Sequence, residues 1–423
     1  MVRKSLGGAH RRFESMFMIA AERVSPSSPQ PSQRAAGTRS PFARLRELLD
    51  HTPPGKPAIS LAVGEPQHAI PSFVGPVLAA HLDEFGRYPM NKGLDGFCGA
   101  AADWLARRFP LPRPLHPTRE VLVLNGSREG LFLAAMAAVQ WVGARRGRPA
   151  ILMPNPFYGA YEAAALAAHC EPVYLPATAA SGFLPDLAAL PDELLARTVA
   201  FYLATPANPQ GSVAEPQYLA RLAALARRFG FLLFSDECYS EIYTQRAPGS
   251  ALEVAGPQFD NVVVFQSLSK RSNLPGLRVG FAAGDAKFLA RFLELRNVSA
   301  PQVPMPAQHV AIAAYADEAH VEENRRLYAR KFDVADQIIG GRYGYRRPAG
   351  GFLLWLDVSA HGGGEAVTLR LWREAGLRVV PGSYLAREQA DGTNPGAGYI
   401  RAALVQGAET TAEALHRLVG LLG

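Results

Sequence analysis

Short apolar runs recur through the middle of the chain, between segments that are rich in polar residues. Many of their residues are β-branched or aromatic, and polar positions do not alternate with apolar ones inside them. Such runs are typical of strands that are buried on both faces of a sheet. The runs lie at residues 121–124, 150–153, 172–175, 199–204, 231–234 and 262–265.

Amphipathic segments separate several of these runs. Residues 215–228 place Leu219 and Leu222 on one face of a helix. Pro216 suits the first turn of this helix, and Gly230 suits its end. Apolar strands that alternate with helices predict an α/β fold, with a mainly parallel sheet covered by helices on both faces. In such a sheet, binding groups collect beyond the carboxyl ends of the strands.

The last third of the chain predicts a smaller α/β domain. Its expected helices and strands alternate over residues 325–339, 352–358, 367–374, 399–405 and 410–422. Near the N-terminus, a Ser-, Pro- and Gln-rich stretch cannot offset the entropy cost of ordering. We therefore predict a flexible basic extension over 1–39, the N-terminal part of a small domain over 40–75, a large domain over 76–300, and the rest of the small domain over 301–423.

The composition, 48% hydrophobic and 19% charged, is typical of a globular protein with a large core. The net charge of +7 is unevenly spread, because residues 1–39 hold seven Lys or Arg against two Glu. The body of the chain is then nearly neutral, so we expect no nucleic-acid partner. No run approaches the roughly 18 apolar residues that span a bilayer, and we expect no membrane partner.

Cysteines and histidines narrow the chemistry further. Cys98, Cys170 and Cys238 are far apart and odd in number, which favours a reducing, cytoplasmic location over a disulfide framework. The histidines are scattered without the close spacing of a zinc site, so we expect no metal. Neither a GxGxxG turn after a strand nor a GxxxxGK[ST] loop is present, which disfavours hydride and phosphoryl transfer.

Polar residues follow directly after several predicted strands. The run at 121–124 leads into Asn125-Gly126-Ser127-Arg128, where successive backbone N–H groups and a helix N-terminus would form an anion cradle. The strands that follow would present Asn208, Asp236 with Tyr239, and Lys270 with Arg278.

Together these groups predict a site for pyridoxal 5'-phosphate (PLP) at one sheet edge. A lysine amine can form a Schiff base with the cofactor, and a carboxylate can hold its pyridine nitrogen protonated, so that the ring acts as an electron sink. Asp236 alone could be a turn residue, and Lys270 alone could be a solvated loop lysine. Their combination with a phosphate cradle favours a cofactor site over these two structural readings.

Three strings, ATPANPQG, FSDECYSEIY and SLSKRSNLPGLRVGF, resemble the fold-type I PLP-dependent enzymes of the class I/II aminotransferase family. The resemblance extends from about Ser40 to the C-terminus. Within this family, the string SLSKRSNLPGLRVGF, together with NGSREGLF and MPNPFYGAYE, is most similar to the bacterial succinyldiaminopimelate aminotransferases of the lysine and diaminopimelate pathway.

The resemblance implies a role for each residue around the cofactor. Lys270 would carry the cofactor and shuttle a proton, and Asp236 would pair with the pyridinium. Asn208 and Tyr239 would hydrogen-bond the phenolate oxygen of the ring. The remaining implied contacts are the phosphate ligands Ser127, Arg128, Ser267 and Arg278, and the stacking ring of Tyr158.

The resemblance also implies how substrates bind. Arg401 would grip the substrate α-carboxylate with its planar fork of donors, next to Asn208. Gly64 would belong to a segment that closes over the substrate. Arg128, or alternatively Lys92, would meet a distal carboxylate. Tyr88 would reach the phosphate of the neighbouring subunit, which requires a homodimer with shared active sites.

The implied reaction uses amino acids and 2-oxo acids, with glutamate as donor and N-succinyl-2-amino-6-oxopimelate as acceptor. The alternatives are an aminotransferase for aspartate, alanine or aromatic amino acids, and a carbon–sulfur lyase on the same scaffold. A PLP-sensing transcription regulator is disfavoured, because the N-terminal extension is too short and too rich in Pro and Ser for a winged helix-turn-helix.

Overall fold

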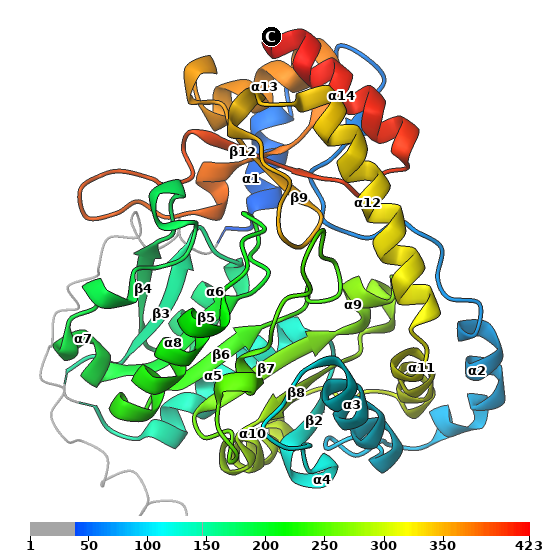
Figure 1. Cartoon of the computed structure of the whole chain (residues 1–423), viewed down its shortest axis with the longest axis vertical. Helices are drawn as coiled ribbons and strands as arrows, with labels where there is room; N and C mark the ends of the chain where they lie inside the picture. The colour runs from blue at the N-terminus through cyan, green and yellow to red at the C-terminus, as the bar shows by residue number, and fades with distance from the viewer. Residues whose placement is uncertain (1–38, 146) are drawn as a thin grey trace, which may run out of the picture. The chain divides into compact units, whose positions relative to one another are not determined.

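The computed structural model describes residues 39–145 and 147–423, and its largest sheet has the strand order β2-β8-β7-β6-β5-β3-β4 (Figure 1). Strands β3 to β7 run parallel to one another, whereas β8 is antiparallel to its neighbours β2 and β7. The predicted α/β fold with a mainly parallel sheet is therefore confirmed. The strands are β2 (Val121–Leu124), β3 (Ala150–Asn155), β4 (Glu171–Pro176), β5 (Thr198–Ala204), β6 (Leu232–Asp236), β7 (Val262–Ser267) and β8 (Gly280–Gly284).

Hydrophobic cores lie on both faces of this sheet, because successive strand residues point to opposite sides. In β5, Phe201 and Leu203 pack in the core that contains α3, α8 and α11. Ala200 and Tyr202 pack in the core that contains α5, α6 and α10. These helices are α3 (Asp95–Arg108), α5 (Ser127–Val142), α6 (Gly159–Ala167), α8 (Pro216–Phe229), α10 (Ala286–Ser299) and α11 (Met305–Ala316), and the shorter helices are α2 (Val74–Ala80), α4 (Pro117–Glu120), α7 (Asp192–Arg197) and α9 (Leu268–Arg271).

Helix α8 shows how the local sequence sets the ends of an element. Pro216 occupies its first turn, where the missing N–H has no helical partner to lose. Gly230 ends it in the left-handed conformation, with φ 68°. Leu219 and Leu222 are buried against the sheet, as the spacing predicts.

A second group of elements forms around the C-terminal third. Strands β11, β12 and β9 form an antiparallel sheet in that order, and β1 pairs in parallel with β10. Helices α12, α13 and α14 close its core through Phe332, Leu371 and Leu418. The elements are α1 (Pro41–Leu49), β1 (Ile59–Ser60), α12 (Ala319–Ile339), β9 (Leu353–Asp357), α13 (Gly364–Ala375), β10 (Leu377–Arg378), β11 (Val380–Pro381), β12 (Tyr399–Ala403) and α14 (Ala408–Leu422).

The predicted domain boundaries stay a prediction, and two observations bear on them. Val310 and Ala314 of α11 pack in the core of the large sheet, beyond the boundary expected at residue 300. Ile59 of β1 packs with the C-terminal elements, as the expected small-domain segment over 40–75 would. The extension predicted over 1–39 lies outside the described residues, apart from its last residue.

Strand β8 has no counterpart among the runs expected from the sequence. Its residues, GFAAG, are too small and glycine-rich to stand out as a buried strand. The glycines are needed where it lies, because a Cβ at Gly280 would collide with the carbonyl of Gln266 on β7. The strand completes the sheet between β2 and β7.

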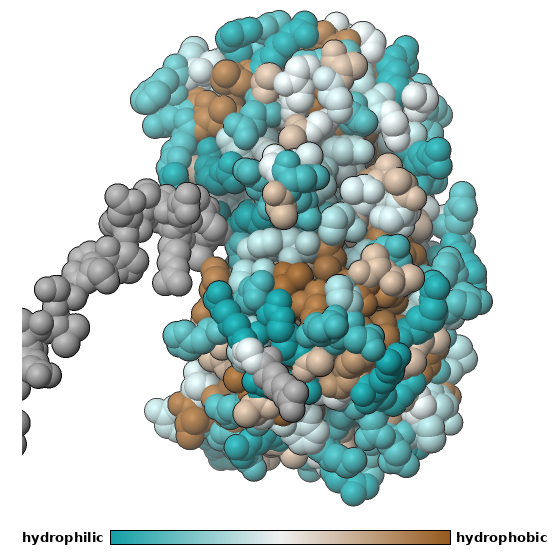
Figure 2. Space-filling model, turned by 90° about the vertical axis from the view of Figure 1, so that its left-hand side faces the viewer, coloured by the Kyte–Doolittle hydropathy of each residue, from teal (hydrophilic) through white to brown (hydrophobic). Residues whose placement is uncertain are grey.

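On the face shown in Figure 2, hydrophobic side chains gather at mid-height and polar side chains surround them.

None of the helices within the described residues combines the length and apolar composition that a membrane span needs.

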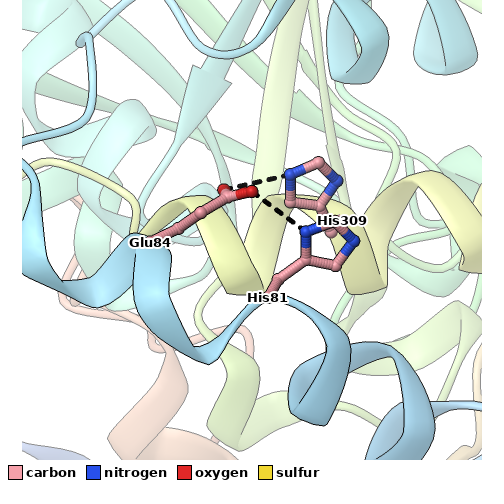
Figure 3. Close-up of side chains that lie close together, drawn as sticks. All are labelled: His81, Glu84 and His309. Carbon is pink, nitrogen blue, oxygen red and sulfur yellow. Dashed lines mark hydrogen bonds and ion pairs between the residues drawn. The ribbon is translucent and has the colours of Figure 1, made fainter.

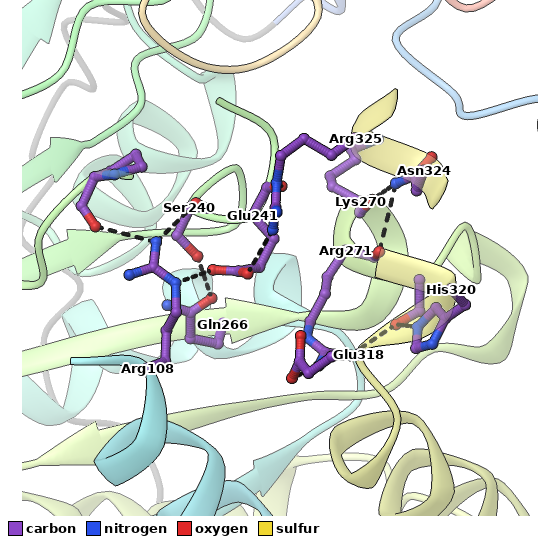
Figure 4. Close-up of polar contacts among 12 residues, drawn as sticks. Arg108, Ser240, Glu241, Gln266, Lys270, Arg271, Glu318, His320, Asn324 and Arg325 are labelled. Atoms are coloured by element: carbon purple, nitrogen blue, oxygen red, sulfur yellow. Dashed lines mark hydrogen bonds and ion pairs between the residues drawn. The ribbon is translucent and has the colours of Figure 1, made fainter. Parts of the chain in front are cut away.

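A buried ion cluster ties helix α12 to the loop that follows β6 (Figure 4). The carboxylate of Glu241 is only 3% exposed and accepts from Arg108 Nε at 2.7 Å. Arg325 of α12 reaches the same carboxylate at 3.4 Å and donates through Nε to the Glu241 carbonyl. Because Tyr239 lies two residues earlier, this cluster fixes a loop that leads away from the sheet edge.

We expect Glu241→Gln to lower the free energy of unfolding by about 3 kcal/mol, since it leaves two arginines near a neutral amide in a nearly dry site. Guanidinium denaturation measures the loss. Glu215→Gln is the matched control, because its ion pair with Arg246 is exposed and is worth at most about 1 kcal/mol. Equal losses in the two variants would show that the cluster does not hold the loop.

Candidate active site

Three neighbouring strands deliver polar residues to one edge of the large sheet. Asp236 ends β6, Ser267 ends β7, and Asn208 follows β5 by a few residues. The sheet order places β5, β6 and β7 side by side and parallel, so their carboxyl ends meet. The N-terminus of α5 begins at Ser127, and the Ser127 hydroxyl accepts from Cys238 Sγ at 3.1 Å, which brings this helix end to the same edge.

Lys270 lies on the short helix α9, directly after β7. Its Nζ donates to the carbonyl of Gly64 at 2.5 Å and lies 5.4 Å from the ring centroid of Phe352. Burial lowers the pKa of Lys270 to about 8, and the charges of Arg401 and Arg128 act in the same direction. About one tenth of this amine is therefore neutral at pH 7, far more than of an ordinary lysine, and the neutral form is the one that a nucleophile or proton acceptor requires.

A polar chain that the sequence did not indicate supports the backbone of Lys270. Asn324 of α12 donates to the Lys270 carbonyl at 3.1 Å, as Figure 4 shows, and its Oδ1 lies 2.7 Å from His68 Nδ1. Lys331 Nζ lies 2.7 Å from His68 Nε2 and donates to the Leu404 carbonyl. An ammonium can only donate, so His68 Nε2 accepts and Nδ1 carries the proton toward Asn324.

Asp236 is buried beside a tyrosine that the sequence analysis missed. Its Oδ2 accepts from Tyr161 at 2.7 Å, and its Oδ1 accepts from the Cys238 amide at 3.3 Å. Burial raises the pKa of Asp236, and these hydrogen bonds oppose the rise. The Tyr161 ring is held by stacking on Tyr202 at 4.6 Å. The second tyrosine of the string FYGAYE is the signal that could have found it.

Arg401 is a buried cation on β12. It is 4% exposed, and its guanidinium donates to Ala62 O at 2.6 Å and to Asn208 Oδ1 at 3.2 Å. Its Nε is buried with no hydrogen-bond partner, and burial lowers the pKa of Arg401 to about 10. Tyr239 lies close enough for Arg401 to counter the rise that burial causes in the tyrosine pKa.

The residues of the predicted phosphate cradle come from three segments. Gly126 precedes α5 with φ 75°, and a Cβ there would collide with the Arg278 guanidinium. Arg278 itself adopts a left-handed backbone, with φ 60° and ψ 45°, a conformation that is costly for non-glycine residues and concentrates at functional sites. Ser267 caps α9 and accepts from the Ser269 amide at 3.1 Å. The first N–H groups of α5 have no helical partner and are free for an anion.

Arg128 and Tyr158 lie next to this cradle. Arg128 Nε donates to the Tyr158 hydroxyl at 2.5 Å. Tyr158 packs edge-on against Tyr161 at 5.6 Å and, with Asn208, lines a small pocket. The structure thus places Tyr158 and Asn208 around one opening, and Arg128 reaches it through its hydrogen bond to the Tyr158 hydroxyl.

Two predicted residues lie apart from this cluster in the single chain. Tyr88 is 94% exposed, so it is free to contact another molecule. Lys92 pairs with Asp95 at 3.6 Å. Among the described residues, neither is hydrogen-bonded or ion-paired to Lys270, Asp236 or Arg401, and their roles remain predictions.

The charges of the cluster fit PLP and a carboxylate substrate. Within the described residues, Lys270, Arg278, Arg401 and Arg128 form no ion pair with an acid. A phosphate would compensate the charge of Arg278 at the cradle, and a carboxylate would satisfy the orphan Nε of Arg401. Asp236 offers the carboxylate that a pyridinium nitrogen needs, so the residues present fit the cofactor.

A model of the class I and II aminotransferases matches residues 56–418. The chain belongs to this family. Enzymes of this family depend on PLP and act on amino acids and 2-oxo acids, so the chain is a PLP-dependent aminotransferase. The predicted family, enzyme class and cofactor are thereby confirmed.

Individual relatives of this protein are also named as aminotransferases. It is 34% identical over 388 residues to the LL-diaminopimelate aminotransferase of Desulforudis audaxviator, which covers 90% of this chain and 95% of the relative. A crystal structure of an aminotransferase from Neisseria meningitidis is 38% identical with a TM-score of 0.85, and covers 91% of this chain and 98% of that one. A probable N-succinyldiaminopimelate aminotransferase from Thermus thermophilus is 26% identical with a TM-score of 0.80, and covers 90% and 100% of the two chains.

The lowered pKa of Lys270 can be tested in cofactor-free protein by trace acylation and mass spectrometry. We expect the labelling rate of Lys270 to rise with pH and level off above about 8, because only the neutral amine reacts. The exposed Lys56 in the same sample supplies the reference rate. A Lys270 rate that keeps rising toward roughly pH 10.4, the ordinary lysine value, would contradict the buried environment.

Proposed function

We propose that this aminotransferase acts on diaminopimelate, exchanging an amino group between LL-diaminopimelate and 2-oxoglutarate. The observation that carries the proposal is the set of cations without acid partners among the described residues, in which Arg401 donates to Asn208 and Arg128 donates to Tyr158, two residues that line the same pocket. A long dicarboxylic substrate presents two carboxylates that can compensate two such cations. Relatives named LL-diaminopimelate aminotransferase support this choice at 34% and 31% identity.

A second candidate is the succinylated substrate expected from the sequence. The Thermus thermophilus structure, whose title names N-succinyldiaminopimelate, favours it at 26% identity. The two candidates differ by one amide and one further carboxylate, so they make different demands on the charge around the pocket.

The proposed cofactor contacts follow the geometry described above. When bound, PLP withdraws electrons from the substrate α-carbon and so makes its proton acidic. Asp236, positioned by Tyr161, would hold the pyridine nitrogen protonated. Asn208 and Tyr239 would hydrogen-bond the ring oxygen, and Tyr158 would cover the ring. The phosphate would lie against the N-terminus of α5 at Ser127, with Ser267 and Arg278.

The chain's own residues then move the proton and hold the substrate. Lys270 Nζ, with its pKa near 8, would accept the α-proton and return it. Arg401 would bind the α-carboxylate through its unpaired Nε while Asn208 keeps the guanidinium in plane. Gly64, whose carbonyl accepts from Lys270 Nζ at 2.5 Å, places the segment before His68 next to the reacting groups.

We also propose a homodimer in which Tyr88 completes the partner's site. Large apolar side chains in the same stretch of the chain are more than half exposed in the single chain: Ile70 is 59% exposed, Leu82 56%, Phe85 58% and Met90 64%. Such a concentration is typical of a surface that another protein covers.

Substrate choice is tested by mixing cofactor-loaded protein with one amino acid at a time and following the cofactor's visible absorbance. We expect LL-diaminopimelate and glutamate to convert it fastest, with N-succinyl-LL-diaminopimelate slower. Faster conversion by the succinylated compound would favour the second candidate. Fast conversion by aspartate, alanine or phenylalanine, with none by either diaminopimelate, would overturn both. Lys270→Ala is the control and should convert with no donor.

The distal contact is tested by Arg128→Ala. We expect KM for glutamate to rise roughly tenfold or more, since a charged hydrogen bond is worth about 1.5–3 kcal/mol. KM for alanine, which has no distal carboxylate, should change little. Lys92→Ala is the matched comparison. Equal effects of Arg128→Ala on both donors would remove the assignment, and a glutamate-selective effect of Lys92→Ala would transfer it to Lys92.

A further inference from the structure

Two histidines and a glutamate meet away from the cofactor site (Figure 3). His81 directly precedes the short helix η1 (Leu82–Gly86), which follows α2, and Glu84 lies in the first turn of η1. His309 comes from α11, a helix that packs against α2 and α3 on the large sheet. The two histidines are 228 positions apart in number, so no local motif in the sequence could show this pairing.

The side chains converge on the carboxylate of Glu84. His81 Nδ1 lies 3.0 Å from Glu84 Oε1, and His309 Nε2 lies 3.1 Å from Glu84 Oε2. The two imidazole rings stack on each other, with centroids 3.6 Å apart and an interplanar angle of 6°. One ligand atom from each residue lies within 4.8 Å of the others.

This set of donors has the composition of a transition-metal site. Two imidazole nitrogens and one carboxylate oxygen suit Zn²⁺ and its first-row neighbours, whereas Mg²⁺ and Ca²⁺ prefer oxygen ligands alone. A glutamate carboxylate is ionised at neutral pH, so Glu84 is available as an anionic ligand. In the single chain the side chains keep 31%, 31% and 25% of their surface exposed, so an ion can reach them from solvent in the unassembled protein.

Binding of a metal ion would change the arrangement of the two stacked imidazole rings. A ring nitrogen donates its lone pair in the plane of the ring, so two parallel rings cannot both aim at an ion between them. A metal therefore requires the rings to tilt apart around the ion, and their exposure allows this movement. The carboxylate, which now bridges the two nitrogens, would become the third ligand.

We propose that His81, Glu84 and His309 bind one divalent first-row transition-metal ion, with water completing its coordination. The ion joins η1 to α11 and so braces the segment that leads into Tyr88. The site is separate from the residues that contact the proposed cofactor and substrate. Its existence does not depend on which amino acid the enzyme uses.

The test uses full-length protein without an affinity tag, stripped of metal with a chelator and then titrated with Co²⁺. We expect one equivalent per chain to bind and give d–d absorbance at longer wavelength than the cofactor. Zn²⁺ should displace the Co²⁺ and raise the melting temperature in proportion to its occupancy.

Matched variants locate the ion. His309→Gln and Glu84→Gln should each lose the d–d absorbance and the melting shift, while His416→Gln, an exposed histidine of α14, should keep both. No stoichiometric Co²⁺ binding by the wild type, or equal binding in His309→Gln and Glu84→Gln, would overturn the proposal. Two variants from different elements guard against a folding defect in one.

Discussion

Positive charge without a matching acid is the constraint on which this active site depends. Lys270 and Arg401 are both removed from water, and neither forms an ion pair within the described part of the chain. Burying a cation costs free energy unless a partner compensates it. The fold meets that cost with backbone carbonyls at Gly64 and Ala62, which stabilise the cations but leave their charge available. A phosphate and two carboxylates are the natural complement of such a site.

The architecture explains how these charges stay in place. Lys270 and Asp236 come from the ends of adjacent parallel strands, whereas Arg401 comes from the second sheet. The segment around Gly64 and the helix α12 connect the two groups of elements, through the His68–Asn324 contact and the Arg325–Glu241 pair. Lys270 is thus supported from both sides, since Asn324 donates to its carbonyl while its amine donates to the Gly64 carbonyl. The geometry of the site depends on contacts well beyond the strand ends.

The sequence predicted those parts of the structure that short-range patterns encode. Buried strands, the ends of α8 and the motif residues around Lys270 follow from apolar runs, proline and glycine positions, and strings shared with a family. The sequence analysis missed strand β8 because alanine and glycine carry little hydrophobic signal, although the close contacts of this strand require them. The sequence analysis missed Tyr161, His68 and Lys331 for another reason. Their partners lie far away in the chain, and nothing local marks a tyrosine or histidine as the support of another residue. The same holds for His81 and His309, which only the packing of α11 brings together.

The central claim is that Lys270 is the residue that carries PLP. The most direct measurement is to incubate the purified protein with PLP, reduce it with borohydride and locate the added mass by peptide mass spectrometry. The account predicts one pyridoxyl group per chain, on Lys270. Modification spread over surface lysines, or none at Lys270, would contradict it.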